Sequence, residues 1–138
     1  MTKYCNNSSY GNGGFTDTKT VLDPEDDAAT VNWGGAWRMP TDEEKSELWT
    51  QCKWTWIQQG GVNGYKVVGP NGNSIFLPAA GYRSGTLLLS AGSYGYYWLS
   101  SLYTRYPYSA YHVYFYSSSV LSRGINRCLG QSVRPVCP

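Results

Sequence analysis

The sequence predicts a single α+β domain in which two helices precede antiparallel strands joined by long loops. Signals for helix starts are confined to the first 52 residues, whereas later segments alternate between apolar and polar residues and are separated by Gly- and Asn-rich turns. The chain has 138 residues, of which 41% are hydrophobic, which is enough for one hydrophobic core. We therefore expect residues 1–138 to form one domain.

Two segments carry the residues that are expected at the beginning of a helix. In Asp23–Val31, Asp23 would cap the helix, Pro24 would take the first helical position, and the next acidic residues would face the positive end of the helix dipole. The Trp33-Gly34-Gly35 segment would end this helix. In Thr41–Cys52, a threonine and a glutamate three residues later have the spacing of a capping box.

Five short strands are expected after the helices. Residues 69–73 have the Gly, Pro and Asn content of a hairpin turn, which indicates that the first two strands are antiparallel. The expected strands are Tyr65–Val68, Ser74–Leu77, Tyr97–Trp98, Tyr111–Tyr116 and Ser132–Val136. In the last of them, Val133 and Val136 are expected in the core.

The segment Tyr111–Tyr116 alternates with a period of two, as a strand with one buried face does. We expect Val113 and Phe115 to face the core. The residues between and after them then form an outward aromatic row: His112, Tyr114 and Tyr116. The alternative is that all six residues are buried between two layers, because aromatic and β-branched residues favour strands in general.

The composition of Leu99–Gly130 points to a recognition surface. This segment contains no Lys, Glu, Gln, Trp, Met or Asp, and nine of the chain's 13 tyrosines lie between Tyr94 and Tyr116. Tyrosine provides a large amphipathic contact area at low entropic cost, and serine provides adaptable hydrogen bonds, as in antibody binding sites.

Charge is distributed unevenly along the chain. All nine acidic residues lie between Asp17 and Glu47, so residues 1–47, with four basic residues, carry a net charge of −5, and the remainder carries +7. Paired carboxylates for acid–base catalysis, or carboxylate ligands for calcium, cannot come from residues 48–138. The seven basic residues there form no run, so no nucleic-acid partner is expected.

The four cysteines leave the redox compartment open. They are too dispersed for a zinc site, and they allow either disulfides, in three pairings, or free thiols: Cys5, Cys52, Cys128 and Cys137. The longest aliphatic run is Leu87–Leu89, so no membrane insertion is expected. Residues 1–14 are polar and lack the apolar segment of a secretory signal.

Four motifs in a fixed order resemble one protein family. They are Asn32-Trp33-Gly34-Gly35-Ala36-Trp37-Arg38-Met39-Pro40-Thr41, Ser74-Ile75-Phe76-Leu77-Pro78-Ala79-Ala80-Gly81-Tyr82-Arg83, Tyr97-Trp98 with Ser100-Ser101, and Ser132-Val133-Arg134-Pro135-Val136. Over about Lys3–Val136 the chain is similar to the Fibrobacter succinogenes major paralogous domain. That domain resembles the C-type lectin fold used by variable proteins of diversity-generating retroelements. The resemblance implies a C-type lectin-like fold with a variable region at 97–136.

The same resemblance implies an origin for the composition of Leu99–Gly130. In retroelement variable proteins, a reverse transcriptase scrambles AAC-type asparagine codons at two positions. Such codons can encode Tyr, Ser, Leu, Arg, His, Ile, Phe, Pro, Gly or Thr, but not Lys, Glu, Gln, Trp or Met. The positions that the resemblance assigns to variation and ligand binding are Leu99, Leu102, Tyr103, Arg105, Tyr106, Tyr108, His112, Tyr114, Tyr116, Leu121, Arg123, Ile125 and Leu129.

Scaffold residues are expected as islands between the variable positions. They are Ala110, Tyr111, Val113, Phe115, Ser117, Ser118, Val120, Arg127, Cys128 and Gly130. Gln131 cannot arise from a scrambled codon. If the region is diversified in this way, Gln131 must therefore be a fixed position. The three outward residues that strand alternation indicates are all among the positions assigned to variation. We expect this row to share one face with Tyr103, Arg105, Tyr106 and Tyr108.

Enzymatic and calcium-dependent functions are not expected. The calcium motifs of sugar-binding C-type lectins (Glu-Pro-Asn, Gln-Pro-Asp and Trp-Asn-Asp) do not occur, and the single histidine, His112, stands at a position assigned to variation. We therefore expect a non-enzymatic receptor-recognition or adhesin-type domain without metal or cofactor. Its ligand would be a protein or glycan on a cell surface, and its location a phage particle or a bacterial surface.

The alternative function is that of a constant lectin-like module on a cell surface, which binds glycans through exposed aromatic residues. The sequence contains six tryptophans that could stack on sugars. Their positions in the family motifs, however, place most of them in the core.

Overall fold

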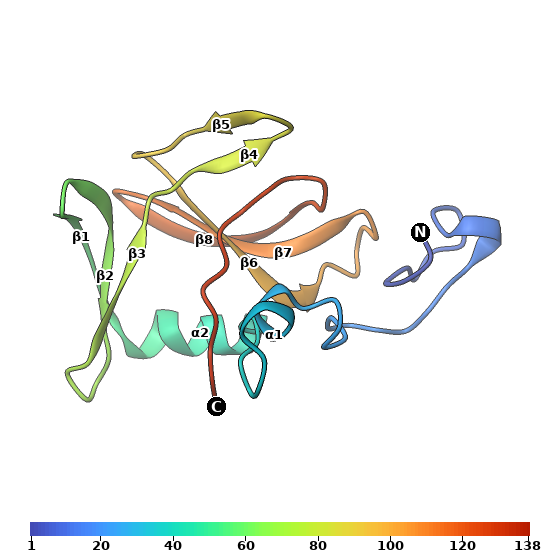
Figure 1. The fold of residues 1–138 in the computed structure, drawn as a ribbon, viewed down its shortest axis with the longest axis horizontal. Helices are drawn as coiled ribbons and strands as arrows, with labels where there is room; N and C mark the ends of the chain where they lie inside the picture. The colour runs from blue at the N-terminus through green and yellow to red at the C-terminus, as the bar shows by residue number, and fades with distance from the viewer.

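The computed structural model describes all 138 residues and has two α-helices and three antiparallel sheets, which confirms the α+β class (Figure 1). The elements are η1 (Asn12–Gly14), α1 (Ala28–Trp33), α2 (Asp42–Gln51), β1 (Lys53–Gln59), β2 (Val62–Val68), β3 (Ser74–Pro78), β4 (Tyr82–Ser84), β5 (Leu87–Leu89), β6 (Gly95–Leu102), β7 (Ser109–Tyr116) and β8 (Ser119–Asn126). Neither α-helix has the length and apolar character needed to cross a membrane.

Helix α1 begins later than the sequence predicts, and Asp23 does not cap it. The N-cap is Asp27, whose buried carboxylate accepts hydrogen bonds from the second and third amides of the helix at 2.9 and 3.1 Å. The same carboxylate also accepts from the backbone amide of Met39. Because Asp27 satisfies the helix and a distant loop together, the helix starts there, and residues 24–26 form a turn. The helix ends at Gly34, as predicted.

Helix α2 has the capping box that the sequence predicts. Thr41 Oγ1 accepts a hydrogen bond from the Glu44 amide at 3.3 Å, and the Glu44 carboxylate accepts one from the Thr41 amide at 2.9 Å. Arg38 donates two further hydrogen bonds to this carboxylate, at 2.6 and 2.7 Å, and thereby lowers the pKa of Glu44 to about 2. These contacts fix the direction in which the chain enters α2.

The sheet β1-β2-β3 contains one strand that the sequence analysis missed. Strands β2 and β3 form the expected hairpin, and β1 pairs with the other side of β2. The two-residue turn between β1 and β2 is Gly60-Gly61, with φ of 59° and 82°. Two consecutive glycines with positive φ are the usual solution for such a tight hairpin.

The sheet β6-β7-β8 contains most of the segment Leu99–Gly130. Strand β7 pairs with β8 along its whole length, across a turn at Ser117-Ser118. The sequence predicted β6 and β7, although not β8. The strand expected at Ser132–Val136 is wrong, because this segment makes only isolated bridges, one beside β6 and one beside Arg38.

The hydrophobic core lies between these two sheets, and α2 adds apolar side chains at its edge. Val113 and Phe115 are buried as predicted, with exposed fractions of 5% and 0%. The rings of Tyr65, Tyr97 and Trp56 lie around Phe115, with centroids 5.3, 5.7 and 6.3 Å away. The alternation expected in β7 therefore has the correct register.

Val133 and Val136 are half-buried rather than in the core. Their segment is not a strand inside a sheet, so only part of each side chain is covered. The tryptophans also lie nearer the surface than predicted. Trp33, Trp37 and Trp49 are 57%, 40% and 47% exposed, and the other three are half-buried.

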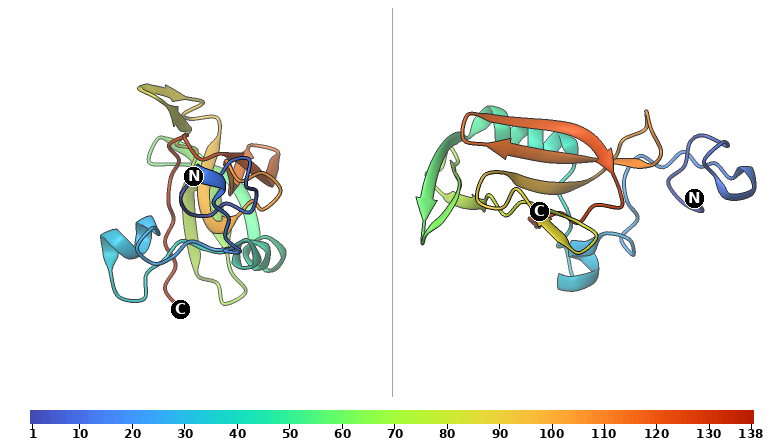
Figure 2. Two further views of the ribbon diagram at one scale, coloured as in Figure 1. Left: turned by 90° about the vertical axis from the view of Figure 1, so that its right-hand side faces the viewer. Right: turned by 90° about the horizontal axis from the view of Figure 1, so that it is seen from above.

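The sheet β6-β7-β8 crosses the middle of the molecule, with α2 below it and the β4-β5 hairpin projecting above it (Figures 1 and 2). The N-terminal segment extends past the loop between β6 and β7, where the Tyr10 and Tyr108 rings are 5.5 Å apart. All four cysteines are free thiols, and only Cys5 is buried.

Candidate functional site

The sheet β6-β7-β8 has two faces of different character. On β7, Tyr111, Val113 and Phe115 point to the core, whereas the residues that alternate with them point to the opposite side, which we call the outer face. Residues that are paired on neighbouring strands have their side chains on the same face, so the pairing register assigns the residues of β6 and β8 to the two faces. The outer face contains Tyr96 and Trp98 of β6, His112, Tyr114 and Tyr116 of β7, and Leu121, Arg123 and Ile125 of β8.

Aromatic rings on the outer face form one connected row, the outer row, which consists of Tyr94, Tyr96, His112, Tyr114 and Tyr116. The Tyr96 ring lies nearly parallel to those of His112 and Tyr114, at 5.8 and 6.0 Å. Tyr94 connects to both Tyr96 and Tyr116, at 6.1 and 5.3 Å. The four tyrosines are half-buried, so each has an exposed part.

His112 does not lie on the surface as predicted, because only 3% of it is exposed. It points to the outer face, but Tyr96, Tyr114 and Trp98 surround its ring, and its Nδ1 is 3.0 Å from Gln131 Oε1. Burial lowers the pKa of His112, so the neutral ring is favoured. His112 therefore supports the tyrosines of the outer row from below and offers little surface to a ligand.

Strand β8 adds three candidate positions to the outer face. Leu121 lies opposite Tyr114, Arg123 opposite His112, and Ile125 opposite Ala110. The Arg123 guanidinium carbon is 5.8 Å from the centre of the Tyr114 ring, and no carboxylate lies within salt-bridge distance of it. The outer face thus combines aromatic, aliphatic and cationic groups.

A second aromatic group, the loop cluster, lies at the end of the sheet and consists of Tyr103, Tyr106, Tyr108 and Tyr10. Tyr106 stands 6.0 and 5.7 Å from the rings of Tyr103 and Tyr108, and Arg105 lies 5.5 Å above it. Tyr106 and Tyr108 are each 42% exposed.

The expectation that the loop cluster and the outer row share one face is wrong. Tyr103 is half-buried and meets Tyr111, a core-face residue, with ring centroids 5.0 Å apart. Its ring occupies the place where a Cβ on Gly124 would lie, 2.5 Å from the ring atoms. No ring contact connects the loop cluster with the outer row. The candidate positions therefore form two separate surfaces.

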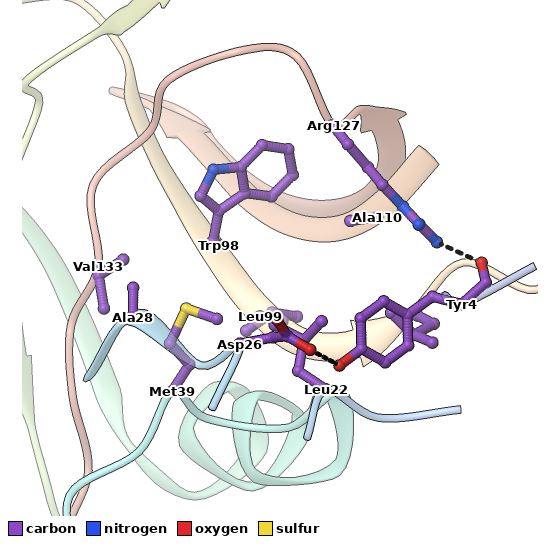
Figure 3. A pocket seen from close by; sticks show the side chains of 11 residues that line it. Tyr4, Leu22, Asp26, Ala28, Met39, Trp98, Leu99, Ala110, Arg127 and Val133 are labelled. Atoms are coloured by element: carbon purple, nitrogen blue, oxygen red, sulfur yellow. Dashed lines mark hydrogen bonds between the residues drawn. The ribbon is translucent and has the colours of Figure 1, made fainter. Parts of the chain in front are cut away.

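Leu99 and Leu102 are not surface residues, contrary to prediction. They are 3% and 6% exposed, Leu99 belongs to the core, and both line an apolar cavity of about 260 Å³ (Figure 3). Leu102 pairs with Ala110 and so lies on the same side of the sheet as His112. It is buried because residues from the N-terminal part of the chain, among them Tyr4 and Leu22, line the same cavity and cover it. Leu129, after β8, is half-buried.

The polar groups at this cavity are already paired with one another. Tyr4 donates its hydroxyl hydrogen to Asp26, and Arg127 donates to the backbone oxygens of Tyr4 and Ser109, both at 3.1 Å (Figure 3). A ligand site needs a few convergent polar groups that are free to orient the ligand. Apart from the Trp98 indole N–H, the cavity offers none, so it is weaker than the outer face as a candidate site.

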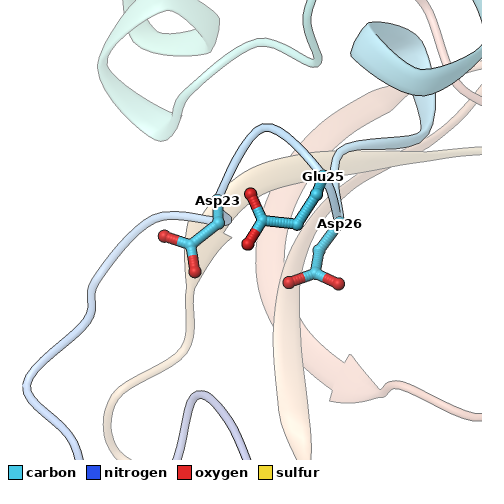
Figure 4. Close-up of side chains that lie close together, drawn as sticks. All are labelled: Asp23, Glu25 and Asp26. Atoms are coloured by element: carbon cyan, nitrogen blue, oxygen red, sulfur yellow. The ribbon is translucent and has the colours of Figure 1, made fainter.

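Three carboxylates, those of Asp23, Glu25 and Asp26, lie within 4.8 Å of one another (Figure 4). Lys3 is paired with all three, and Lys19 with Asp23. Hydrogen bonds from Lys19 and Lys3 lower the pKa of Asp23 and Asp26, respectively. Because Lys3 and Lys19 already pair with all three carboxylates, the cluster serves to hold the N-terminal segment on the turn before α1.

Two residues of the outer row, Tyr94 and Tyr96, were not among the predicted site residues. Tyr96 has a signal in the sequence, since it alternates with the buried Tyr97 in β6. Tyr94 precedes the strand and has no such signal. Gln131, expected to be fixed, contacts the row through His112, and its Nε2 is buried without a partner.

The chain matches no family model, no curated protein and no solved structure.

Proposed function

We propose that this chain is a non-enzymatic, adhesin-type recognition domain with a C-type lectin-like fold, whose binding surface is diversified by a retroelement. One observation carries the proposal. Six positions assigned to variation (112, 114, 116, 121, 123 and 125) lie on the outer face, and four of the five scaffold positions in β7 and β8 (111, 113, 115 and 120) lie on the core face. The fifth, Ala110, lies on the outer face opposite Ile125. The resemblance assigns the positions within β8 without any strand being predicted there, so their alternation supports the assignment.

This separation has a physical advantage for a diversified protein. Substitutions on the outer face leave the contacts around Phe115 unchanged, so many variants can retain the fold. Exposed parts of Tyr114 and Tyr116, with Arg123, are the side-chain types that dominate binding energy at interfaces. Leu99, Leu102 and His112 would act through the packing beneath this surface.

The geometry around the only histidine favours binding over catalysis. The single hydrogen bond of His112 is with Gln131, so no serine hydroxyl, thiol or carboxylate is paired with it. Residues 48–138 contain no carboxylate side chain. By resemblance, the ligand would be a protein or glycan on a cell surface, and the carrier a phage particle or a bacterial surface.

Sequencing this coding region in many cells of a natural population tests the diversification. We expect a near-copy of the region and a reverse transcriptase gene nearby, with substitutions in codons 112, 114, 116, 121, 123 and 125 at the nucleotides where the near-copy has adenines. Codons 111, 113, 115 and 120 are the internal control and should stay fixed. Equal variation on both faces, or none, would contradict the proposal.

A binding experiment tests the surface itself. The labelled domain is applied to printed arrays of bacterial cell-surface glycans and of random peptides, beside the double variant Tyr114→Ser/Tyr116→Ser. Signals that the variant loses support the outer face as the binding site. Signals that it retains in full place the site elsewhere.

The glycan-binding alternative has one observation in its favour. Trp33 and Trp37, on and just after α1, are 57% and 40% exposed, and exposed indole rings stack well on sugars. On the same arrays, glycan signals that disappear in Trp33→Ala/Trp37→Ala but persist in Tyr114→Ser/Tyr116→Ser would support a constant lectin-like module instead.

A further inference from the structure

The two edges of the sheet β6-β7-β8 differ in how they are covered. The edge of β6 is paired by other segments: Trp98 donates its amide hydrogen to Ser132 O at 3.0 Å, and Leu102 donates to Thr20 O at 2.7 Å. The edge of β8 has no such partner. Strand β8 is the outermost strand of the sheet, and no backbone hydrogen bond joins its outer edge to another segment. The one polar contact from this part of β8 to another element is made by a side chain: Ser122 Oγ donates to Asp42 Oδ1, at the start of α2, at 3.1 Å.

The pairing register shows which backbone amide and carbonyl groups of β8 have no hydrogen-bond partner. The Arg127 amide donates to Tyr108 O at 3.1 Å, and hydrogen-bonded pairs alternate along an antiparallel ladder. Leu121, Arg123 and Ile125 therefore bond to β7. Val120, Ser122 and Gly124 direct their amide and carbonyl groups to the open edge, and no hydrogen bond to these groups is formed there.

The open edge has few of the features that normally protect a sheet edge. Strand β8 is eight residues long, pairs with β7 without a bulge, and contains no proline or lysine. Proteins usually shorten, bend or charge such an edge, since it can pair with any extended chain. The one charged residue, Arg123, has its guanidinium near the Tyr114 ring on the outer face.

The side chains beside the open edge define what could pair with it. A strand added antiparallel to β8 would place alternate side chains next to Leu121, Arg123 and Ile125, in the pairs whose side chains approach most closely. Arg123 has no carboxylate partner, and residues 48–138 have a net charge of +7. An acidic residue between two apolar residues therefore fits this edge.

We propose that the open edge of β8 binds an extended peptide segment of a partner protein, antiparallel to β8, with a carboxylate beside Arg123 and apolar side chains beside Leu121 and Ile125. This proposal rests on the proposed function, because it names the class of ligand and the way the outer face binds it. Main-chain hydrogen bonds to Val120, Ser122 and Gly124 would hold any such segment. Leu121, Arg123 and Ile125, which are assigned to variation, would select its sequence.

A second copy of the chain fits this edge less well. Pairing β8 with its own copy around a two-fold axis would bring the two Arg123 side chains to the same face near the axis, with no carboxylate in β7 or β8 to separate them. Like charges at such positions oppose pairing.

The probe for the test is the fluorescein-labelled peptide acetyl-Thr-Ile-Thr-Glu-Thr-Ile-Thr-amide. We expect saturable binding by fluorescence anisotropy, and slower hydrogen exchange at the amides of Val120, Ser122 and Gly124 in NMR spectra. N-methylation of the backbone amides at the second, third and fourth threonines, which face β8 opposite Gly124, Ser122 and Val120, should abolish binding. N-methylation of the isoleucine and glutamate amides, which face away, should leave it intact.

Two protein variants complete the design. Arg123→Glu should weaken binding at least tenfold, and a peptide with Lys in place of Glu should restore it, whereas Lys66→Glu on the other sheet should have no effect. Ser122→Pro, which removes one edge donor without breaking the ladder to β7, should also weaken binding at least tenfold. Because Ser122 Oγ also donates to Asp42 Oδ1, Ser122→Ala is the matched control and should bind as the parent does.

Three results would overturn the proposal: no saturable binding, equal binding of both N-methylated peptides, or a dimer in sedimentation with the same three amides already protected. The third result would assign the edge to a second copy. If Ser122→Pro keeps the array signals that Tyr114→Ser/Tyr116→Ser loses, the edge proposal fails while the proposed function stands.

Discussion

The two faces of the sheet β6-β7-β8 both carry aromatic rings, but only the core face meets rings from a second sheet. There, Phe115 stacks on Tyr97 of its own sheet at 19° and meets Trp56 and Tyr65 of the other sheet edge-on, at interplanar angles of 75° and 83°. On the outer face, Tyr96 lies nearly parallel to His112 and Tyr114, at 19° and 17°. The core rings interlock across two sheets, whereas the outer rings are supported mainly by their neighbours on one sheet.

This difference shows that aromatic content alone does not separate a core from a binding surface. Tyr65 and Tyr97 are buried, and Tyr114 and Tyr116 are half-buried, although all four stand in strands. Position in the alternation decides the outcome, because each step along a strand reverses the face. The comparison therefore predicts unequal effects of equivalent substitutions on the two faces.

The largest expected effect belongs to the core face. Phe115→Ala removes a ring that is fully buried among three other aromatic rings and should lower the free energy of unfolding by about 3–5 kcal/mol. Urea denaturation followed by tryptophan fluorescence measures the loss. Tyr116→Ala, one residue along and on the opposite face, is the matched control. A loss below about 1 kcal/mol for Phe115→Ala would place Phe115 outside the core.

A smaller effect is expected from adding one methyl group to the same face. A Cβ on Gly95 would lie 2.0 Å from Phe115 Cζ, so Gly95→Ala must displace a ring that has no free space and should cost about 1–3 kcal/mol. Gly124→Ala presses in the same way on the Tyr103 ring, which is only half-buried and can move. Thermal unfolding should therefore show a larger loss for Gly95→Ala, and equal losses would mean that Phe115 is not rigidly packed.

The sequence predicted the elements whose signals are local. The capping box of α2, the β2-β3 hairpin and the alternation of β7 each depend on residues within a few positions of one another. The sequence analysis missed the N-cap of α1, because Asp27 is held in place by a hydrogen bond from the backbone amide of Met39, twelve residues away. The Gly60-Gly61 turn was an available signal for β1, whereas Ser117-Ser118 and Gly124 give β8 little strand character.

The candidate surface was predicted in part for the same reason. Period-two alternation placed Tyr114 and Tyr116 on the outer face, but it could not show that Gln131 and Trp98 cover His112 from other parts of the chain. Leu102 is buried by residues far away in the sequence, among them Tyr4 and Leu22, which line the same cavity. Tyr103 lies on the other side of the sheet because Gly124, 21 residues later, leaves room for its ring.

The buried histidine makes the stability of the folded domain depend on pH. Burial lowers the pKa of His112 in the folded domain, while the unfolded chain keeps an ordinary pKa of about 6.5. The unfolded state therefore takes up the proton first, and this contribution to stability is lost as pH falls below about 6.5 toward the lower pKa of the folded state. Urea midpoints measured between pH 8 and 5 should show this loss. In His112→Asn the decline over that interval should be reduced, and an unchanged decline would assign it to other groups.

The smallest effect on stability is expected from substitutions of the partly exposed tyrosines of the outer row. The same substitutions should have the largest effect on binding. Tyr114→Ser and Tyr116→Ser each remove a half-buried ring with stacked neighbours on one sheet and should cost roughly 1 kcal/mol or less. Both variants should keep the cooperative unfolding transition of the parent, because Phe115 and its neighbours are untouched. The double variant should nevertheless lose its array ligands, since a few aromatic and arginine side chains dominate such interfaces.

If the double variant unfolds like Phe115→Ala, the outer row is part of the core and the two faces do not differ in the way proposed. If it stays folded and binds as the parent does, the loop cluster becomes the candidate, and Tyr106→Ser/Tyr108→Ser is the next variant to measure on the same arrays.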